Sequence, residues 1–255
     1  MNERAIIELS GVDVSYVEAT DVILIHDVNW AIGPGEFWVV SGGPASGKSS
    51  LLMTAAGLNR PGAGTLRFFG GSLAEASEPD QIGWRRRIGF LFDGGGRLFS
   101  HLTVAENIAL PLQYHLDVEE PTALARVDEL LGQTELQEHA HLTPSHLNFR
   151  LQQRASLART LAAAPEVLFL DNPLGGLSQR EGRWWVDFLR QLRATHLPTG
   201  EPMTLVLSGD DFHGWLDVAD HFAFIDAGQF RVIGGREQLV SSSEPVVREF
   251  LTSEI

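Results

Sequence analysis

The fold of this chain is decided by the stretch Ser41-Gly42-Gly43-Pro44-Ala45-Ser46-Gly47-Lys48-Ser49-Ser50. The apolar run before it, residues 37–40, predicts a buried strand, and the run after it, residues 51–56, predicts the first turns of a helix. Residues 42–49 fit the pattern Gly-x-x-x-x-Gly-Lys-Ser/Thr, which brings backbone N–H groups and a helix N-terminus up to phosphate oxygens. The stretch therefore predicts a phosphate-binding loop.

Each fixed position of this loop has a chemical task. Gly42 and Gly47 permit a turn with no side chain between the backbone and a phosphate. Lys48 is expected to meet the β- and γ-phosphates of a nucleotide, and the Ser49 hydroxyl to ligate Mg²⁺. The alternative is a glycine-rich turn that binds nothing, but strand, loop, Lys-Ser pair and helix all occur in register. We therefore predict that all residues of 42–50 contribute to binding.

Composition bounds the class of protein. The chain has 255 residues, of which 44% are hydrophobic, and this size suits one α/β domain that carries an insertion. It has no cysteine, which excludes disulfides and thiolate metal sites. It also lacks an apolar run of about 18 residues and, over residues 1–9, the pattern of a secretory signal. We therefore expect a cytosolic protein.

The charge argues against nucleic acid as a partner. The formal net charge is -14, and binding along a nucleic acid needs a positive face. One basic cluster, Arg85-Arg86-Arg87, is too short to change this expectation. We interpret the cluster as the solvated end of a helix. Contact with a membrane partner or with lipid headgroups stays an open alternative.

The N-terminal part predicts an antiparallel layer at the edge of the nucleotide-binding sheet. Residues 6–16, 22–25 and 28–32 have strand-like patterns, and residues 65–69 return to the same layer. Tyr16 ends the first strand, just before a polar loop. Its ring either stacks on adenine or packs within the protein.

Three apolar runs, at residues 88–92, 167–170 and 203–207, predict core strands. Parallel α/β sheets place their ligands at the carboxyl ends of the strands. Asp171 follows the second run directly, so we expect it at the Mg²⁺ edge of the site. Asp93 follows the first run at the same edge.

A helical segment is inserted between these strands. Residues 103–145 and 152–164 have helical spacing, and we place the boundaries of the insertion at about 94–162. In its second helix the predicted apolar face is made of Leu124, Val127, Leu130 and Leu131. This face needs another element to pack on.

These landmarks, in this order, resemble the ATP-binding subunit of an ABC transporter over nearly the whole chain. Gly42–Ser50 matches the Walker A loop, 168–171 the Walker B strand, and 152–159 the helix after the signature sequence. Tyr16 matches the aromatic residue that stacks on adenine. The resemblance implies the P-loop fold of the ABC ATPases: one α/β domain over residues 1–255, with a mostly parallel core sheet, an antiparallel β layer and a helical insertion.

The same resemblance implies ATP as cofactor, with Mg²⁺ held by Ser49, Asp93 and Asp171. A narrower likeness is to the Mla-type ATPases of MCE lipid-transport systems. It is carried by Leu98-Phe99, by residues 106–112 and by the ending Ser243-Glu244-Pro245-Val246-Val247-Arg248-Glu249-Phe250-Leu251.

The departures from the family fall on the hydrolytic residues. Asn172 stands where the family has the glutamate that polarises the attacking water, and Gly209 stands at the switch histidine. Asp93 occupies the glutamine position, where it can still hold Mg²⁺, and Ser178 replaces an acidic residue. A neutral amide accepts no proton from water, and loss of a general base costs about 10²–10⁴ in rate.

The signature is also changed. The family has Leu-Ser-Gly-Gly-Gln, and this chain has Leu147-Asn148-Phe149-Arg150-Leu151. Its glycines let one subunit approach the γ-phosphate held by the other, so the Phe149 ring is expected to block that approach. Arg150 leaves an alternative open, because a guanidinium is a strong phosphate ligand.

We therefore expect an ATP-binding subunit whose hydrolysis is impaired or lost, with a regulatory or structural role. The rival is an active ATPase in which Asp93, Asp210 or Arg150 has taken over the lost tasks, and a third hypothesis is a purely structural domain. The family resemblance implies a transmembrane permease, a second ATP-binding subunit (the same chain or a paralogue) and an MCE chain as partners. It places the protein on the inner face of the membrane.

Overall fold

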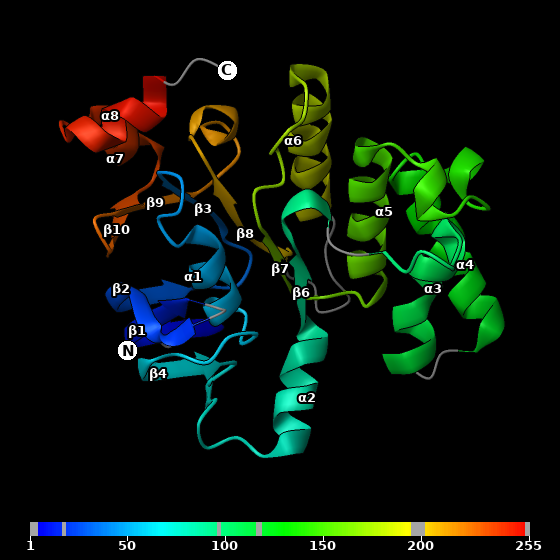
Figure 1. Cartoon of the computed structure of the whole chain (residues 1–255), viewed down its shortest axis with the longest axis horizontal. Helices are drawn as coiled ribbons and strands as arrows, with labels where there is room; N and C mark the ends of the chain where they lie inside the picture. Colours follow the sequence, from blue (N-terminus) through cyan, green and yellow to red (C-terminus); the bar gives the residue numbers. More distant parts are fainter. Residues whose placement is uncertain (1–4, 17–18, 96–97, 116–118, 195–201, 253–255) are drawn as a thin grey trace.

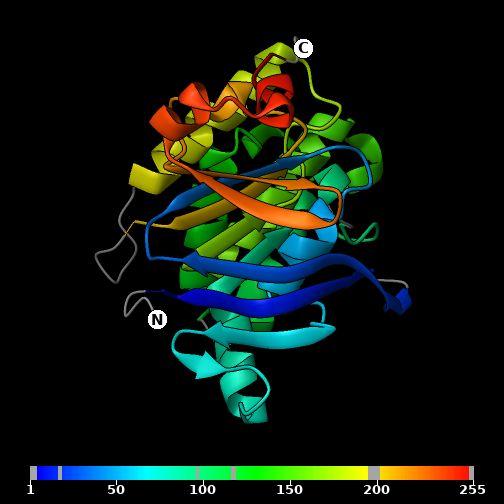
Figure 2. The same ribbon diagram turned by 90° about the vertical axis from the view of Figure 1, so that its left-hand side faces the viewer.

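The computed structural model describes residues 5–16, 19–95, 98–115, 119–194 and 202–252. Within these residues, ten strands form one sheet in the order β5-β4-β1-β2-β10-β9-β3-β8-β7-β6. Figure 1 shows the antiparallel strands at one end of the molecule and a group of helices at the other. Seen from the side in Figure 2, the strands twist steadily across the sheet.

The predicted antiparallel layer is present. Strand β1 (Ile7–Tyr16) pairs with β2 (Ala19–Ile32) and with β4 (Ala63–Phe68), and β5 (Gly71–Ser72) lies at the edge. One expectation was wrong, because β2 does not break between residues 25 and 28. Its register shifts there, with Asp27 at φ 50, and the Asp27 N–H donates to Asp13 Oδ1 (3.0 Å). This bulge bends the strand without ending it.

The core strands are parallel, as predicted. Strand β3 (Phe37–Gly42) lies between β8 (Thr204–Gly209) and β9 (His221–Asp226). Strand β7 (Val167–Leu170) pairs with β8, and β6 (Ile88–Leu91) with β7. All residues of β3, β7 and β8 are buried, which explains their uninterrupted apolar runs. Their carboxyl ends meet at one edge of the sheet.

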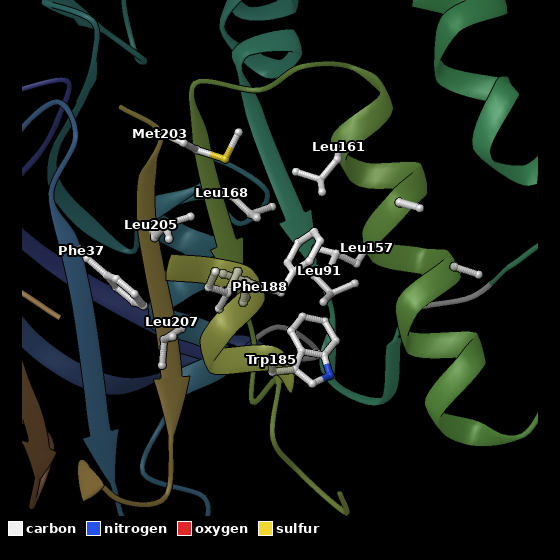
Figure 3. Packing of buried hydrophobic residues seen from close by; sticks show 14 of the residues in the cluster. Phe37, Leu91, Leu157, Leu161, Leu168, Trp185, Phe188, Met203, Leu205 and Leu207 are labelled. Atoms are coloured by element: carbon white, nitrogen blue, oxygen red, sulfur yellow. The ribbon is translucent and has the colours of Figure 1, made fainter. Parts of the chain in front are cut away.

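The remaining β10 (Gln229–Gly234) runs antiparallel to β9 and links it to β2. Helix α1 (Lys48–Ala55) follows β3, and helix α2 (Glu78–Arg87) precedes β6. Helix α6 (Gln179–Ala194) follows β7. Figure 3 shows Trp185 and Phe188 of α6 packed with Leu168, Leu205 and Leu207 of the strands. The C-terminal helices are α7 (Arg236–Ser241) and α8 (Pro245–Thr252).

The helical segment comprises α3 (Val104–His115), α4 (Glu120–Gln133) and α5 (Phe149–Ala162), with short 3₁₀ turns η2 (Gln137–His139) and η3 (Pro144–His146). In Figure 1 it lies at the end of the molecule opposite β1 and β2. No helix among the described residues is both long and apolar enough to cross a bilayer.

One residue of the predicted apolar face of α4 was assigned wrongly. Val127, Leu130 and Leu131 are buried, but Leu124 is 58% exposed. Ala123 takes the inward position at that turn, and the next residue of a helix points about 100° away from it.

The basic cluster 85–87 ends α2, as expected. Arg87 in it is more than a solvated charge, since it donates to both carboxylate oxygens of Glu166 (2.6 and 2.7 Å) and its guanidinium lies over the Phe69 ring.

Candidate nucleotide-binding site

The loop between β3 and α1 closes tightly. Gly47, at the helix N-cap, has φ 98, and a Cβ there would lie 3.2 Å from Ile25 Cδ1. A Cβ on Gly42 would lie 2.6 Å from Ser46 Oγ and 2.9 Å from Ile225 O. Only glycine fits both positions, and the first turn of α1 opens towards the loop. This is the strand–loop–helix arrangement that the sequence predicts.

Lys48 folds back over this loop. Its Nζ donates to Gly42 O (2.6 Å) and Gly43 O (3.2 Å), and it lies 3.2 Å from Asp210 Oδ1. Lys48 is also the only lysine of the sequence: the other 18 of the 19 lysine and arginine residues are arginines. A compact ammonium fits into a narrow loop where a planar guanidinium does not. The single lysine therefore sits where its geometry is required.

Asp171 lies at the end of β7 and is 5% exposed. Ser208 Oγ donates to its Oδ1 (2.7 Å). Burial raises the pKa of Asp171 above its ordinary value, and the nearby Asp93 acts in the same direction. Hydrogen bonds from Ser208 and Ser49 and the charge of Lys48 lower this pKa without cancelling the effect of burial. The ionised carboxylate therefore needs more positive charge nearby than Lys48 provides.

A magnesium ion would supply this charge. The Ser49 hydroxyl lies near enough to the Asp171 carboxylate to lower its pKa, and both groups are the hard oxygen donors that Mg²⁺ prefers. Among the described residues, no three acidic, histidine or cysteine side chains gather into a metal cage. That fits Mg²⁺, which proteins hold by one or two side chains together with phosphate oxygens and water.

A cavity of about 420 Å³ brings most of the predicted residues together. Its walls are formed by Tyr16, Leu24, Pro44, Ala45, Ser46, Gly47, Lys48, Ser49, Ser50, Asp93, Asp171, Asn172 and Asp210. Tyr16 is 44% exposed in this wall, so its ring is accessible to a base. Gly42 and Gly43 are not among the lining residues, but their carbonyl oxygens accept hydrogen bonds from Lys48 Nζ.

The structure has neither an acidic nor an imidazole group at the two positions where a base and a switch histidine are expected: Asn172 lines the nucleotide cavity, and Gly209 lines a neighbouring one. Asn172 has φ 46; its N–H donates to Ser208 Oγ (3.0 Å), and its amide packs against Gly175. Gly209 ends β8 and has no side chain. A second cavity, of about 690 Å³, opens beside it. A Cβ added to Gly209 would stay 3.4 Å from Asp211 O, so there is room for a side chain.

His213 does not replace the missing histidine. It begins the 3₁₀ turn η4 (His213–Trp215) and is exposed, as expected for a surface histidine. It is not among the residues that line the nucleotide cavity.

Residues 147–151, which by resemblance occupy the signature position, lie at and just before the start of α5. Asn148 caps this helix, because its Oδ1 accepts from Leu151 N (3.0 Å). Phe149 is the first helical residue, 44% exposed. Its ring lies between two loops, since a Cβ on Gly94 would be 3.9 Å from it and a Cβ on Gly176 would be 3.7 Å from it. The Phe149 ring thus fills space that would stay open if residues 149 and 150 were the two glycines of the family signature.

Arg150 is engaged elsewhere. Its Nη1 donates to Glu181 Oε1 (2.9 Å), at the start of α6. The other oxygen of Glu181 accepts from Arg154 (3.3 Å), whose guanidinium lies over the Trp184 ring. Glu181 therefore ties the signature segment to α6 of the same chain.

Sequence reasoning missed Ser208, Leu24 and Glu181. Ser208 reaches Asp171 because β7 and β8 are neighbours and Leu170 pairs with Leu207. The order of strands in a sheet is set by tertiary packing, so no local pattern indicates this contact. Leu24 lines the cavity beside the phosphate loop, and Glu181 pairs with Arg150. In both cases the partners are far apart in the sequence.

Comparison with known proteins agrees with this geometry. A family model described as ABC transporter matches residues 25–175. The chain is 35% identical to the sulfate/thiosulfate import ATP-binding protein CysA of Caulobacter vibrioides, over 86% of this chain and 62% of that protein. It is 34% identical to the methionine import ATP-binding protein MetN 1 of Rhodococcus jostii, over 82% and 60%. The macrolide export ATP-binding/permease protein MacB of an Azoarcus species is 34% identical over 74% of this chain and 29% of that protein.

The chain thus spans less than two thirds of the length of these curated relatives. Solved structures of other proteins show that the fold of this chain is similar as well. CbiO1 of Clostridium perfringens superposes with a TM-score of 0.79 at 22% identity, over 98% of this chain and 96% of that one. A dimeric ATP-binding cassette bound to ADP and phosphate superposes with a TM-score of 0.77 at 25% identity, over 90% and 99%. On this sequence and structural evidence, the chain is an ATP-binding domain of the ABC transporter family.

Proposed function

We propose that this chain is the ATP-binding subunit of an ABC transporter that captures ATP and Mg²⁺ but hydrolyses ATP slowly or not at all. The observation that carries the proposal is the contrast between Asp171 and Asn172, which are adjacent and line one cavity. Asp171 is placed with Ser49 to hold Mg²⁺, whereas the amide of Asn172 accepts no proton. Gly209 offers no group at the switch position.

The roles of the chain's own groups follow from these positions. The bound nucleotide supplies the terminal phosphoryl group that ABC ATPases transfer to water. Lys48 and the N–H groups at the start of α1 bind phosphate oxygens, and the Tyr16 ring stacks on the base. Phe149 occupies the segment through which a partner subunit's site would be closed. These groups support nucleotide binding. The missing general base alone lowers the rate of hydrolysis about 10²- to 10⁴-fold.

The test is the turnover number per site in the complex purified from its natural host, with Lys48→Ala as control. We expect a rate far below ordinary enzyme rates of about 1–10³ s⁻¹. Turnover within that range, abolished by the control, would sink the proposal.

The rival function is an active ATPase, and one observation favours it: Asp93 and Asp210 both line the cavity. If either has become the base, Asp93→Asn or Asp210→Asn eliminates turnover and leaves ATP affinity largely intact. The purely structural alternative is separated by isothermal titration with ATP and Mg²⁺, since it predicts no heat and no stabilisation.

The proposed membrane partner is supported by a third cavity, of about 500 Å³, between the core and the helical segment. Its walls come from α2, β6, α3 and α5 and include Ile82, Arg85, Arg86, Phe90, Pro111 and Arg159. A lining that combines apolar side chains with three arginines fits a short helix of a transmembrane permease. Such a permease, and a second ATP-binding subunit of the same or a related kind, would hold the chain on the inner face of the membrane.

Association with an MCE lipid-transport system is part of the same proposal. It is supported by the resemblance of residues 98–99, 106–112 and 243–251, the last of which covers most of α8. The curated relatives act on sulfate, methionine or macrolides by their names, so they do not indicate lipid. Affinity purification of the tagged chain at its native level decides this: an MCE chain in the complex supports the proposal, and a solute-binding chain contradicts it.

A further inference from the structure

The environment of Lys48 contains a feature that nucleotide capture does not require. Its ammonium donates hydrogen bonds to Gly42 O and Gly43 O, and it forms an ion pair with Asp210 Oδ1 at 3.2 Å. The two carbonyls belong to the loop itself. Asp210 comes from the end of β8, far away in sequence, and its side chain is 73% exposed. Its carboxylate is the charged group that a phosphate meets at Nζ.

The distances to Lys48 Nζ limit how far the Asp210 carboxylate and a bound phosphate can be apart. A phosphate oxygen that binds an ammonium lies about 2.8 Å from the nitrogen. Asp210 Oδ1 lies 3.2 Å from the same nitrogen. If both stay in contact, they are at most about 6 Å apart, a separation at which two unit charges change a dissociation constant by about 3- to 100-fold, depending on screening.

The balance of charge at this end of the cavity is negative. Three carboxylates, of Asp93, Asp171 and Asp210, line the cavity with one ammonium, Lys48. One Mg²⁺ compensates Asp171 and part of the phosphate charge. The charge of a γ-phosphate then comes on top of Asp93 and Asp210. A nucleoside diphosphate carries one negative charge fewer and leaves the carboxylate end of the cavity free.

We propose that Asp210 is the internal counter-ion of Lys48 and biases the site towards a nucleoside diphosphate over a triphosphate. The inference rests on the proposed function in one respect, that residues 42–50 bind a nucleotide. It assigns Asp210 a role opposite to that of a catalytic base: the carboxylate competes with the terminal phosphate for the loop lysine. Occupancy of the site would then report the ratio of ADP to ATP.

The first experiment measures dissociation constants of ADP and ATP, each with Mg²⁺, by isothermal titration of the full chain. For the unmodified protein we expect tighter binding of ADP. Asp210→Asn keeps the shape and removes the charge, so it should tighten ATP binding about tenfold and ADP binding about threefold. The control, Asp217→Asn, removes an equally exposed charge that pairs with Arg236, and it should change neither constant.

Unchanged affinities in Asp210→Asn, or weaker ATP binding, would overturn the inference and leave nucleotide capture standing. If no variant binds either nucleotide, the proposed function fails as well, and a second readout still tests the ion pair. Because Lys48 is the only lysine, selective isotope labelling gives a single lysine Cε–Hε resonance. Asp210→Asn should shift this resonance in the absence of nucleotide and Asp217→Asn should not; an unmoved resonance shows that the pair does not form.

Discussion

The loop after β3 and the turns after β7 and β8 meet at one edge of the sheet, yet they differ in what they offer a nucleotide. The first loop has each group that phosphate capture needs, from the tight turn at Gly42 and Gly47 to Lys48 and Ser49. The second region keeps Asp171 but continues with Asn172 and Gly209. Under the proposed function, the difference means that binding and cleavage depend on separate elements of this fold, so that one can change while the other is kept.

The largest expected effect comes from restoring the second region. We expect the variant Asn172→Glu with Gly209→His, and with residues 148–151 changed to Ser-Gly-Gly-Gln, to raise ATP turnover about 10²- to 10⁴-fold, because base, switch and composite site return together. The measurement is phosphate release per site in the purified complex. A Cβ on Gly209 would meet no atom closer than 3.4 Å.

Asn172→Glu carries a cost in stability that has to be monitored. Asn172 has φ 46, where asparagine is tolerated better than glutamate, so we expect a loss of about 1 kcal/mol in the free energy of unfolding. Thermal unfolding of each variant checks this. A folded restored variant without any gain in turnover would show that the second region is not what limits hydrolysis.

The next effect belongs to the first region. Lys48→Ala removes a charged partner of the phosphates, and a charge-assisted hydrogen bond contributes about 1.5–3 kcal/mol. ATP affinity should therefore fall about 10- to 100-fold in a titration with Mg²⁺ present. Asn172→Ala is the matched change in the second region and should leave the affinity within about twofold. Equal losses in both variants would contradict the division between the two regions.

Ser208→Ala tests the border between the regions, with a smaller effect. The variant removes the hydrogen bond to Asp171 Oδ1, worth about 1 kcal/mol, so Mg²⁺-dependent ATP binding should weaken about fivefold. The pKa of Asp171 is already raised, and Mg²⁺ needs the ionised form. Binding is therefore lost as the pH falls through the raised pKa, and Ser208→Ala should shift this loss to higher pH.

In the metal-free protein the same raised pKa affects the free energy of unfolding, and this effect depends on pH in the opposite direction to Mg²⁺-dependent binding. The contribution of Asp171 to stability is fully present below its ordinary pKa and is lost as the pH rises through the folded-state value. Titrations of ATP with Mg²⁺ measure the first effect, and thermal unfolding of the metal-free protein measures the second, each at pH values that rise from the ordinary pKa of an aspartate. An unchanged pH profile in Ser208→Ala would mean that this serine does not tune Asp171.

The smallest expected effect is that of Arg150→Ala. Its guanidinium pairs with Glu181, so its removal should leave ATP affinity and turnover within about twofold and cost less than about 1 kcal/mol of stability. Arg190→Ala, which breaks a more exposed pair with Asp187 within α6, is the control. A selective loss of ATP binding in Arg150→Ala would revive the arginine as a substitute for the signature.

Much of this could be predicted from local sequence. The loop, the start of α1 at Lys48 and the apolar strand 167–170 follow from spacing and residue type, and the structure has them at those positions. Where prediction failed, a neighbour in space decided. Leu124 is exposed because Ala123 faces the core, and β2 continues through residues 25–28 because Asp13 supports the bulge at Asp27.

The sequence by itself determined which chemical groups are present: a phosphate loop with the chain's only lysine, aspartates after two buried strands, and neither glutamate at position 172 nor histidine at position 209. Tertiary structure alone decided what these groups touch. The contacts of Asp210 with Lys48, of Ser208 with Asp171 and of Arg150 with Glu181 join segments that are far apart in the chain. The physical reason is that strand order and helix packing, which no local pattern encodes, set those distances.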